Sequence, residues 1–263
     1  AHATNNMIND YFDLSGGVDD ENYARALYAP HPILSGMVTK RGLLGAILLF
    51  NFVDVLIALY LFAMRGWPVA AFAGLGLFIS VFYVAPPIRL KHIGLGEPGV
   101  FLVWGPLMIG GTYFVTTGLL PDWGIWLATL PYALVVATVL FGKHIDKLEA
   151  DKAKGIHTLP VLLGSETAKR VNMGLMIGYY VAVLTLVLTG TVGVWVLLVA
   201  FAIPRLLSVL KLYRQPKPAA PPEGYAVWPL WFVSWAFHHN KLAGGMFILG
   251  LVANLILPWK IAW

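Results

Sequence analysis

The chain has 263 residues, of which 59% are hydrophobic and 12% are charged, and its mean hydropathy is +0.74. This composition excludes a soluble globular domain, because so few charged side chains cannot cover its surface. The absence of cysteine excludes disulfides, thiolate nucleophiles and zinc–thiolate sites. The net charge of +5 is divided among several loops instead of forming one basic stripe, so nucleic acid is not an expected partner. We therefore expect an all-α, polytopic transmembrane helical bundle in contact with membrane lipid.

Several apolar segments approach the roughly 20 residues that a helix needs to cross a bilayer. Gly190 and Gly193 supply the turn that divides the longest apolar run into a hairpin. The predicted spans are residues 42–64, 67–85, 98–120, 123–142, 172–189, 192–204 and 242–259. The aromatic segment Trp228–His239 is too short to span and is predicted to lie at the membrane interface. Residues 1–6 show neither a start methionine nor a signal-peptide core, so we expect a fragment that begins inside a helix.

The distribution of charge predicts the topology of the chain. Segments 14–41, 87–97, 143–171 and 211–228 carry 14 of the 18 lysine and arginine residues, and 11 of the 13 acids lie on that same side. Basic loops stay in the cytoplasm. We therefore expect a multi-pass protein of a bacterial or archaeal cytoplasmic membrane whose charged groups face the cytoplasm.

A first acidic cluster lies at the end of a predicted helix, in the sequence Asn-Asp-Tyr-Phe-Asp at residues 9–13. Asn5, Asn9 and Asp13 recur every four residues and line one helix face. The glycines at 16 and 17 let the chain turn back, which brings Asp19 toward that face. Magnesium suits such an oxygen-rich site, because it is held by one or two carboxylates plus substrate phosphates. The open alternative is a solvated helix end with an acidic loop.

A second cluster, residues 143–152, places three acids and three lysines at a helix exit on the same membrane side. Two acid clusters that bracket cations describe a diphosphate site. Asp146 and Asp151 are five residues apart, about 140° around a regular helix, so an irregularity is needed for them to converge. A salt-bridged, solvated helix end remains the alternative.

A third charged stretch, Tyr83–Glu97, leaves a predicted span on that side, and its two adjacent prolines end the helix. Arg89 and Lys91 are plausible phosphate partners. The bias of basic residues toward the cytoplasm explains the same two side chains without any ligand, so both readings stay open.

These three stretches resemble the UbiA superfamily of intramembrane prenyltransferases, in the right order and along nearly the whole chain. The resemblance rests on residues 9–13 with the following turn, on the stretch ending in Gly-Leu-Gly-Glu at 94–97, and on residues 146–164. It implies a nine-helix fold, of which residues 1–263 form a single transmembrane prenyltransferase domain that lacks the first helix. It also implies Mg²⁺ as cofactor, with a prenyl diphosphate and an aromatic acceptor as partners.

The resemblance assigns roles residue by residue, and Asp151 is a safer ligand than Asp146. The implied metal ligands are Asn9, Asp13, Asp19, Asp146, Glu149 and Asp151. The implied substrate-binding residues are Asn9, Asp10, Tyr83, Arg89, Lys91, Lys143 and Lys147, and the implied catalytic residues are Asp13, Lys91 and Asp151.

The identity of the acceptor and the class of protein keep alternatives. Gly17 stands where the first motif usually has an acid, and the spacing to Asp19 is similar to the menaquinone-pathway branch, which prenylates dihydroxynaphthoate. Hydroxybenzoate, homogentisate, porphyrin and glycerol-phosphate acceptors remain open. A transporter or lipid-binding protein is the main competitor from another class, but its charges should cluster at the membrane midplane. The Asp-Gly-x-x-Ala-Arg signature of CDP-alcohol phosphatidyltransferases is absent.

Overall fold

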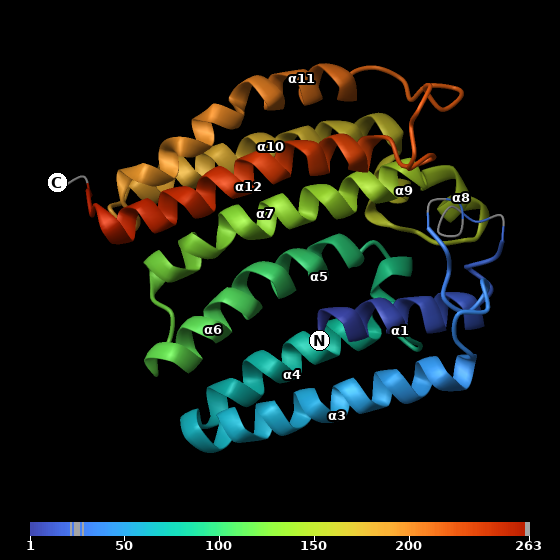
Figure 1. Ribbon diagram of the computed structural model, residues 1–263, viewed down its shortest axis with the longest axis horizontal. Helices are drawn as coiled ribbons and strands as arrows, with labels where there is room; N and C mark the ends of the chain where they lie inside the picture. Colours follow the sequence, from blue (N-terminus) through green and yellow to red (C-terminus); the bar gives the residue numbers. More distant parts are fainter. Residues whose placement is uncertain (22, 24–26, 28, 261–263) are drawn as a thin grey trace.

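The computed structural model describes residues 1–21, 23, 27 and 29–260. Over these residues the chain forms a bundle of helices that lie side by side, which confirms the predicted all-α class (Figure 1). The elements are α1 (His2–Ser15), α3 (Lys40–Arg65), α4 (Trp67–Phe82), η1 (Leu90–His92), α5 (Gly96–Leu102), η2 (Val103–Leu107), α6 (Met108–Thr117), α7 (Trp123–Asp146), α8 (Leu148–Ala153), α9 (Leu159–Leu163), α10 (Ser165–Leu188), η3 (Val194–Ala202), α11 (Ile203–Tyr213) and α12 (Phe232–Ile256).

The long helices have the length and composition of membrane spans. Within the described residues, five helical segments qualify, namely Lys40–Arg65, Gly96–Thr117, Trp123–Asp146, Ser165–Leu188 and Val194–Tyr213. The apolar helix α4 is shorter, with 16 residues. Large apolar side chains such as Leu48 and Phe52 of α3 are exposed, as expected where lipid covers the surface. These observations confirm the prediction of a polytopic membrane protein, and α10 and η3 form the hairpin predicted at Gly190 and Gly193.

The prediction that residues 228–239 form a short interfacial segment apart from the last span is wrong. Residues 232–256 form one continuous helix, α12. The polar residues that interrupt its hydropathy are satisfied inside the bundle: Tyr180 lies 2.8 Å from His239 Nε2, and Asn240 donates to the Val135 carbonyl at 2.7 Å and to Thr138 Oγ1 at 3.0 Å. Because these hydrogen bonds are made, the helix continues through the polar residues.

The span 96–117 contains an irregularity at its centre. Pro106 has no N–H to donate, and the backbone around it widens into the π-turn η2. Gly105 packs tightly on α7: a Cβ there would lie 2.5 Å from the Cβ of Ala133. The close approach fixes this turn, and with it Trp104, against α7.

The charged loops gather at one end of the bundle (Figure 1). The loop after α1, the connection from α4 to α5, the short helices α8 and α9 and the loop before α12 all lie there. The helix α7 ends at Asp146 and α8 begins at Leu148, so the irregularity expected between Asp146 and Asp151 is present at Lys147. This end of the bundle therefore holds both acidic clusters.

Candidate functional site

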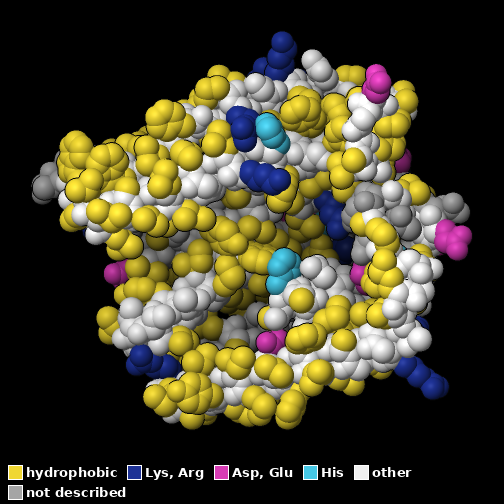
Figure 2. Space-filling view, in the orientation of Figure 1, with side chains coloured by type: hydrophobic (Ala, Val, Ile, Leu, Met, Phe, Trp, Pro, Cys, Tyr) yellow, Lys and Arg dark blue, Asp and Glu magenta, His cyan; other side chains and the backbone are white. Residues whose placement is uncertain are grey.

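A cavity of about 860 Å³ lies between the half of the bundle that contains α1 to α4 and the half that contains α10 to α12. Figure 2 shows the molecule from the same side as Figure 1, and on this face it has a hollow whose interior is mostly hydrophobic. One part of the lining is charged or polar, namely Asn5, Asn6, Asn9, Asp10, Asp13, Asp19, Tyr83, Lys91, Lys143, His144 and Lys147. The other part is mostly apolar and aromatic. It includes Val100, Trp104, Tyr132, Val135, Val136, Val139, Leu140, Phe237, Phe247 and Ile248, together with the polar residues His2, Asn240 and Lys241. The cavity therefore suits an amphiphilic ligand.

The first acidic cluster lies on one face of α1, as its spacing predicted. Asn5, Asn9 and Asp13 all line the cavity, and Ser80 of α4 donates to Asn5 at 3.1 Å, which holds α1 in place. Lys91 of η1 donates to Asp13 Oδ2 at 2.6 Å, and both side chains are largely buried. A short, charge-assisted hydrogen bond of this kind fixes the position of both groups.

Asp19 returns to the same place through the turn after α1. Gly17 has φ 73°, a conformation that favours glycine, and the backbone N–H groups of Val18 and Asp19 donate to the Asp13 carbonyl at 2.8 and 3.1 Å. Burial raises the pKa of Asp19, and the neighbouring charge of Asp13 raises that pKa further. Ligand atoms of Asp10, Asp19 and His31 all lie within 4.8 Å of one another. This turn thus completes a compact group of acids at the end of α1.

Asp151 is the member of the second cluster that contacts Lys147, which lines the cavity. It is completely buried, and its Oδ1 accepts a hydrogen bond from Tyr23 and lies 3.5 Å from the Lys147 ammonium. Burial and the Asp151 carboxylate raise the pKa of Tyr23, so its hydroxyl stays a donor. Lys147 itself lines the cavity. The break between α7 and α8 therefore presents a lysine to the cavity and an acid directly behind it.

Arg89, Asp146 and Glu149 are not brought into this group. Arg89 and Glu149 are exposed and do not line the cavity. Asp146 turns to the other side of the helix exit, where it accepts hydrogen bonds from the backbone N–H groups of Phe232 and Val233, both at 3.0 Å. Lys217 lies 3.5 Å from the same carboxylate. In this position Asp146 caps the first turn of α12.

Capping by Asp146 leads to a prediction about stability. Asp146→Ala leaves two N–H groups of α12 without their acceptor and should lower the free energy of unfolding by about 1–2 kcal/mol. Thermal unfolding in detergent measures this change, with Glu149→Ala as a neighbouring, exposed control. Binding of inorganic diphosphate with magnesium should be unchanged in both variants. Loss of that binding without loss of stability would instead make Asp146 a ligand.

Lys147 leads to a prediction about pH. Its burial lowers the pKa of the ammonium to about 8, so the group is charged at pH 7 and mostly neutral at pH 9. Binding of an anion next to Lys147 should therefore weaken as the pH rises between these values, by up to about tenfold. Titration calorimetry with diphosphate at both values tests this. Lys147→Arg, whose guanidinium stays charged, reports the part of the effect that comes from the ligand; an equal pH dependence in both proteins would contradict the prediction.

The residues present fit a magnesium ion. Two buried oxygen atoms, Asn9 Oδ1 and Asp151 Oδ2, have no hydrogen-bond partner among the described residues. Asp10 and Asp19 offer carboxylate oxygens that lie within 4.8 Å of one another and of a ring nitrogen of His31, and oxygen is the ligand type that magnesium takes. Uncompensated buried oxygens are costly unless a cation or a hydrogen-bond donor satisfies them.

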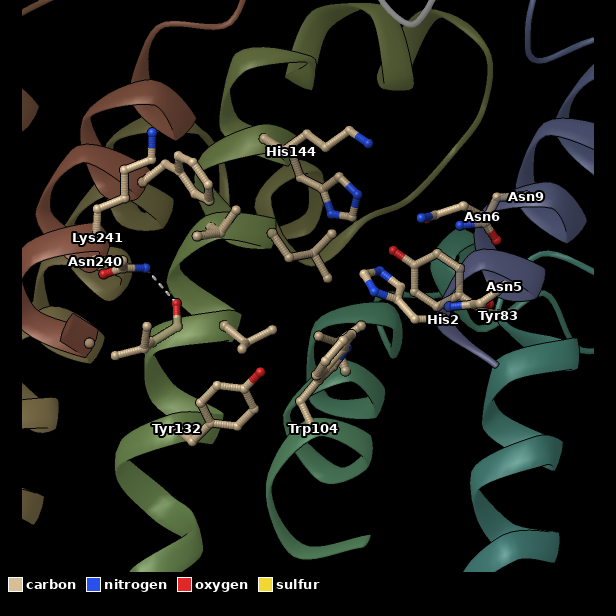
Figure 3. Close-up of a pocket in the computed structure, with 18 of the residues that line it drawn as sticks. His2, Asn5, Asn6, Asn9, Tyr83, Trp104, Tyr132, His144, Asn240 and Lys241 are labelled. Atoms are coloured by element: carbon tan, nitrogen blue, oxygen red, sulfur yellow. Dashed lines mark hydrogen bonds between the residues drawn. The ribbon is translucent and has the colours of Figure 1, made fainter. Parts of the chain in front are cut away.

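The sequence analysis missed several residues that line the cavity or, like Glu97, lie directly behind its lining. Glu97 and His144 form a buried pair, in which Glu97 Oε1 lies 2.6 Å from His144 Nδ1. Their separation in sequence gave no signal, although His144 lies one helical turn before Lys147. Trp104 and Tyr132 form an aromatic wall below His144 in the view of Figure 3, with ring centroids 6.2 Å apart. The available hint for Trp104 was its position within a span, two residues before Pro106.

These features define a membrane-embedded helical bundle whose acidic and basic groups meet at one end of an apolar cavity. The UbiA prenyltransferase family matches residues 1–239, and the chain belongs to this family. The chain is 24% identical over 210 residues to the 1,4-dihydroxy-2-naphthoate octaprenyltransferase of Bacillus subtilis, covering 80% of this chain and 66% of that protein.

Two further relatives have names that mention other substrates. The 2-carboxy-1,4-naphthoquinone phytyltransferase of Synechocystis sp. is 27% identical over 63% of this chain and 52% of its own length. The digeranylgeranylglyceryl phosphate synthase of Haloquadratum walsbyi is 26% identical over 75% of this chain and 64% of its own length. The chain thus spans less than two thirds of the length of each of these three relatives. No solved structure matches the chain.

Proposed function

We propose that this protein transfers a prenyl group from an allylic prenyl diphosphate to an aromatic acceptor in quinone biosynthesis. The observation that carries the proposal is a continuous cavity that joins a lysine- and carboxylate-lined end to an apolar and aromatic wall. A prenyl diphosphate has the same two parts, a polyanionic head and a long apolar tail. Membership of the family supports the proposal.

The charged end is suited to the leaving group. When the carbon–oxygen bond of the allylic diphosphate breaks, the bonding electron pair stays with the diphosphate, and negative charge develops there. Lys91, Lys143 and Lys147 line this end and would neutralise that charge, an effect that is large in a site shielded from water. A magnesium ion held by Asp10, Asp13 and Asp19, with Asn9 and Asp151 behind them, would supply further positive charge to the diphosphate oxygens.

The apolar wall is suited to the allylic cation. Trp104 and Tyr132 present aromatic faces in the cavity, and such faces attract a cation. Apolar neighbours exclude water, which would otherwise capture the cation as an alcohol. A carbon of an electron-rich ring then forms the new carbon–carbon bond, and loss of a proton, or of carbon dioxide from a naphthoate, restores aromaticity.

Dihydroxynaphthoate is the proposed acceptor. The names of two relatives, a dihydroxynaphthoate octaprenyltransferase and a carboxynaphthoquinone phytyltransferase, support a naphthoate-type ring. The spacing from Asp13 to Asp19 points the same way. A hydroxybenzoate, homogentisate, porphyrin or glycerol-phosphate acceptor is the alternative, and the glyceryl phosphate relative keeps the last of these in the comparison. The concentration of basic residues at the charged end favours a cytoplasmic orientation of the site.

The test uses the protein in nanodiscs with magnesium and radiolabelled prenyl diphosphate, and offers the candidate acceptors in parallel. We expect magnesium-dependent formation of a prenylated ring, with the highest rate for dihydroxynaphthoate. Chelation of magnesium with EDTA should abolish the product, and added magnesium should restore it. If no acceptor is prenylated and no prenyl diphosphate binds, the protein belongs with transporters or lipid-binding proteins instead.

A further inference from the structure

The Glu97–His144 pair lies beside the cavity, and none of the groups assigned to the diphosphate uses it. Both side chains are 3% exposed, and the two are joined at 2.6 Å through His144 Nδ1. The second oxygen of Glu97 accepts a hydrogen bond from the backbone N–H of Leu159 at 3.3 Å. Helix α5, helix α7 and the start of α9 thus meet at one carboxylate, which holds the imidazole in a fixed orientation.

This arrangement determines what His144 offers to a ligand. An ionised carboxylate only accepts hydrogen bonds, so Glu97 accepts the hydrogen bond of Nδ1–H, and in the neutral imidazole that this contact orients Nε2 is the acceptor. Among the described residues, Nε2 has no hydrogen-bond partner, and His144 lines the cavity. Figure 3 shows the imidazole extending from α7 into the cavity, on the side of His2 and Tyr83. A hydrogen-bond donor is the group that this site lacks.

The surroundings of His144 favour an aromatic ligand. His144 stands between two zones, because Lys147, one turn further along α7, belongs to the charged end, while Trp104 and Tyr132 form the aromatic wall. His2 packs edge-on against Trp104, with ring centroids 4.7 Å apart. A flat ring that stacks on this wall would carry a substituent to His144. The allylic carbon of a diphosphate held by Lys147 would lie in the same region.

We propose that His144 is the binding site for a ring hydroxyl of the aromatic acceptor, with Nε2 accepting the hydroxyl proton in a hydrogen bond and Glu97 acting as the positioning residue. The inference rests on the proposed function and deepens it by naming the residue that would hold the ring hydroxyl of the acceptor. A ring hydroxyl held by an acceptor is more electron-donating to its ring. The site therefore selects hydroxylated rings over their ethers, because an ether oxygen cannot donate.

The test measures binding and not turnover. Wild-type protein in detergent is loaded with magnesium and a non-hydrolysable prenyl thiodiphosphate, and titration calorimetry then compares dihydroxynaphthoate and hydroxybenzoate with their methyl ethers. Wild type should bind at least one hydroxyarene about tenfold more tightly than its ether. In His144→Leu the ratio should fall to within about twofold. His238→Leu, a histidine on α12 that is exposed and does not line the cavity, should keep the wild-type ratio.

Glu97→Gln provides a sharper readout. The glutamine amide can donate to His144 Nδ1, which moves the imidazole proton to Nε2 and turns the site from an acceptor into a donor. The preference for hydroxyl over ether should then shrink or reverse, while a merely structural role of Glu97 would lower both affinities together.

The outcomes separate this inference from the proposed function. Failure of the wild type to bind the thiodiphosphate contradicts the proposed function, and the inference falls with it. Binding of the thiodiphosphate without binding of any hydroxyarene overturns the inference alone. So does an unchanged hydroxyl-to-ether ratio in His144→Leu.

Discussion

Asp151→Asn should lower the rate of prenyl transfer at least about 100-fold, whereas Glu149→Gln should leave it within about twofold of the wild type. The two acids lie two residues apart on the same short helix, α8. Asp151 is completely buried behind Lys147, with one oxygen that has no hydrogen-bond partner among the described residues. Glu149 is exposed on the other side. The asparagine keeps the shape of the side chain, removes the charge and replaces one acceptor oxygen by an NH2 group.

The measurement is the initial rate of prenylated product in nanodiscs at saturating magnesium. Size-exclusion profiles and thermal unfolding of both variants establish that they fold. Binding of prenyl thiodiphosphate should weaken in Asp151→Asn and stay unchanged in Glu149→Gln. Equal losses in the two variants would contradict the assignment of the second cluster to Asp151.

Asp13→Asn should have a comparable effect on the rate, about 100-fold, and should also destabilise the protein by roughly 2 kcal/mol. The carboxylate of Asp13 is the partner of the Lys91 ammonium at 2.6 Å, so its neutralisation leaves a largely buried cation without its ion pair. Asp122→Asn is the matched control. Asp122 caps the far end of α7, and asparagine is an equally good cap.

A double variant separates the two effects of Asp13. Asp13→Asn combined with Lys91→Met removes the unpaired charge, so stability should return toward that of the wild type. Activity should not return, because both the carboxylate and the cation are then missing from the charged end of the cavity. Thermal unfolding and product formation are measured on the same preparations. If restored stability brought restored activity, the ion pair would be structural only.

Most of the fold could be predicted from hydropathy, because a span needs an apolar length that is visible in the sequence. The exception is α12. Its polar residues His239 and Asn240 look like an interruption, but hydrogen bonds to Tyr180, Val135 and Thr138 satisfy them. Those partners lie on other helices, so no local pattern could reveal that the helix continues.

The candidate site also has a part that local sequence predicts and a part that depends on contacts between distant helices. The convergence of Asn9, Asp13 and Asp19 follows from a four-residue spacing and a glycine turn, both of which are local. The orientation of the second cluster depends on residues that are distant in the sequence. Asp146 faces away because the start of α12 needs a cap, and Phe232 and Val233 lie more than 80 residues further along the chain. The Glu97–His144 pair likewise depends on the contact between α5 and α7.

The open side of the cavity bears on how the length of the product is determined. A closed pocket limits the length of the ligand that it binds, because a longer ligand would clash with the end of the pocket. The hollow in Figure 2 has a hydrophobic interior and opens on the face of the bundle, where the hydrocarbon of the bilayer would continue the same apolar surroundings. Isoprene units beyond the aromatic wall would lie in lipid and meet no barrier. On the proposed function, the described residues around this opening therefore set no limit on the length of the prenyl tail, and the prenyl donor that the cell supplies decides the tail length of the quinone.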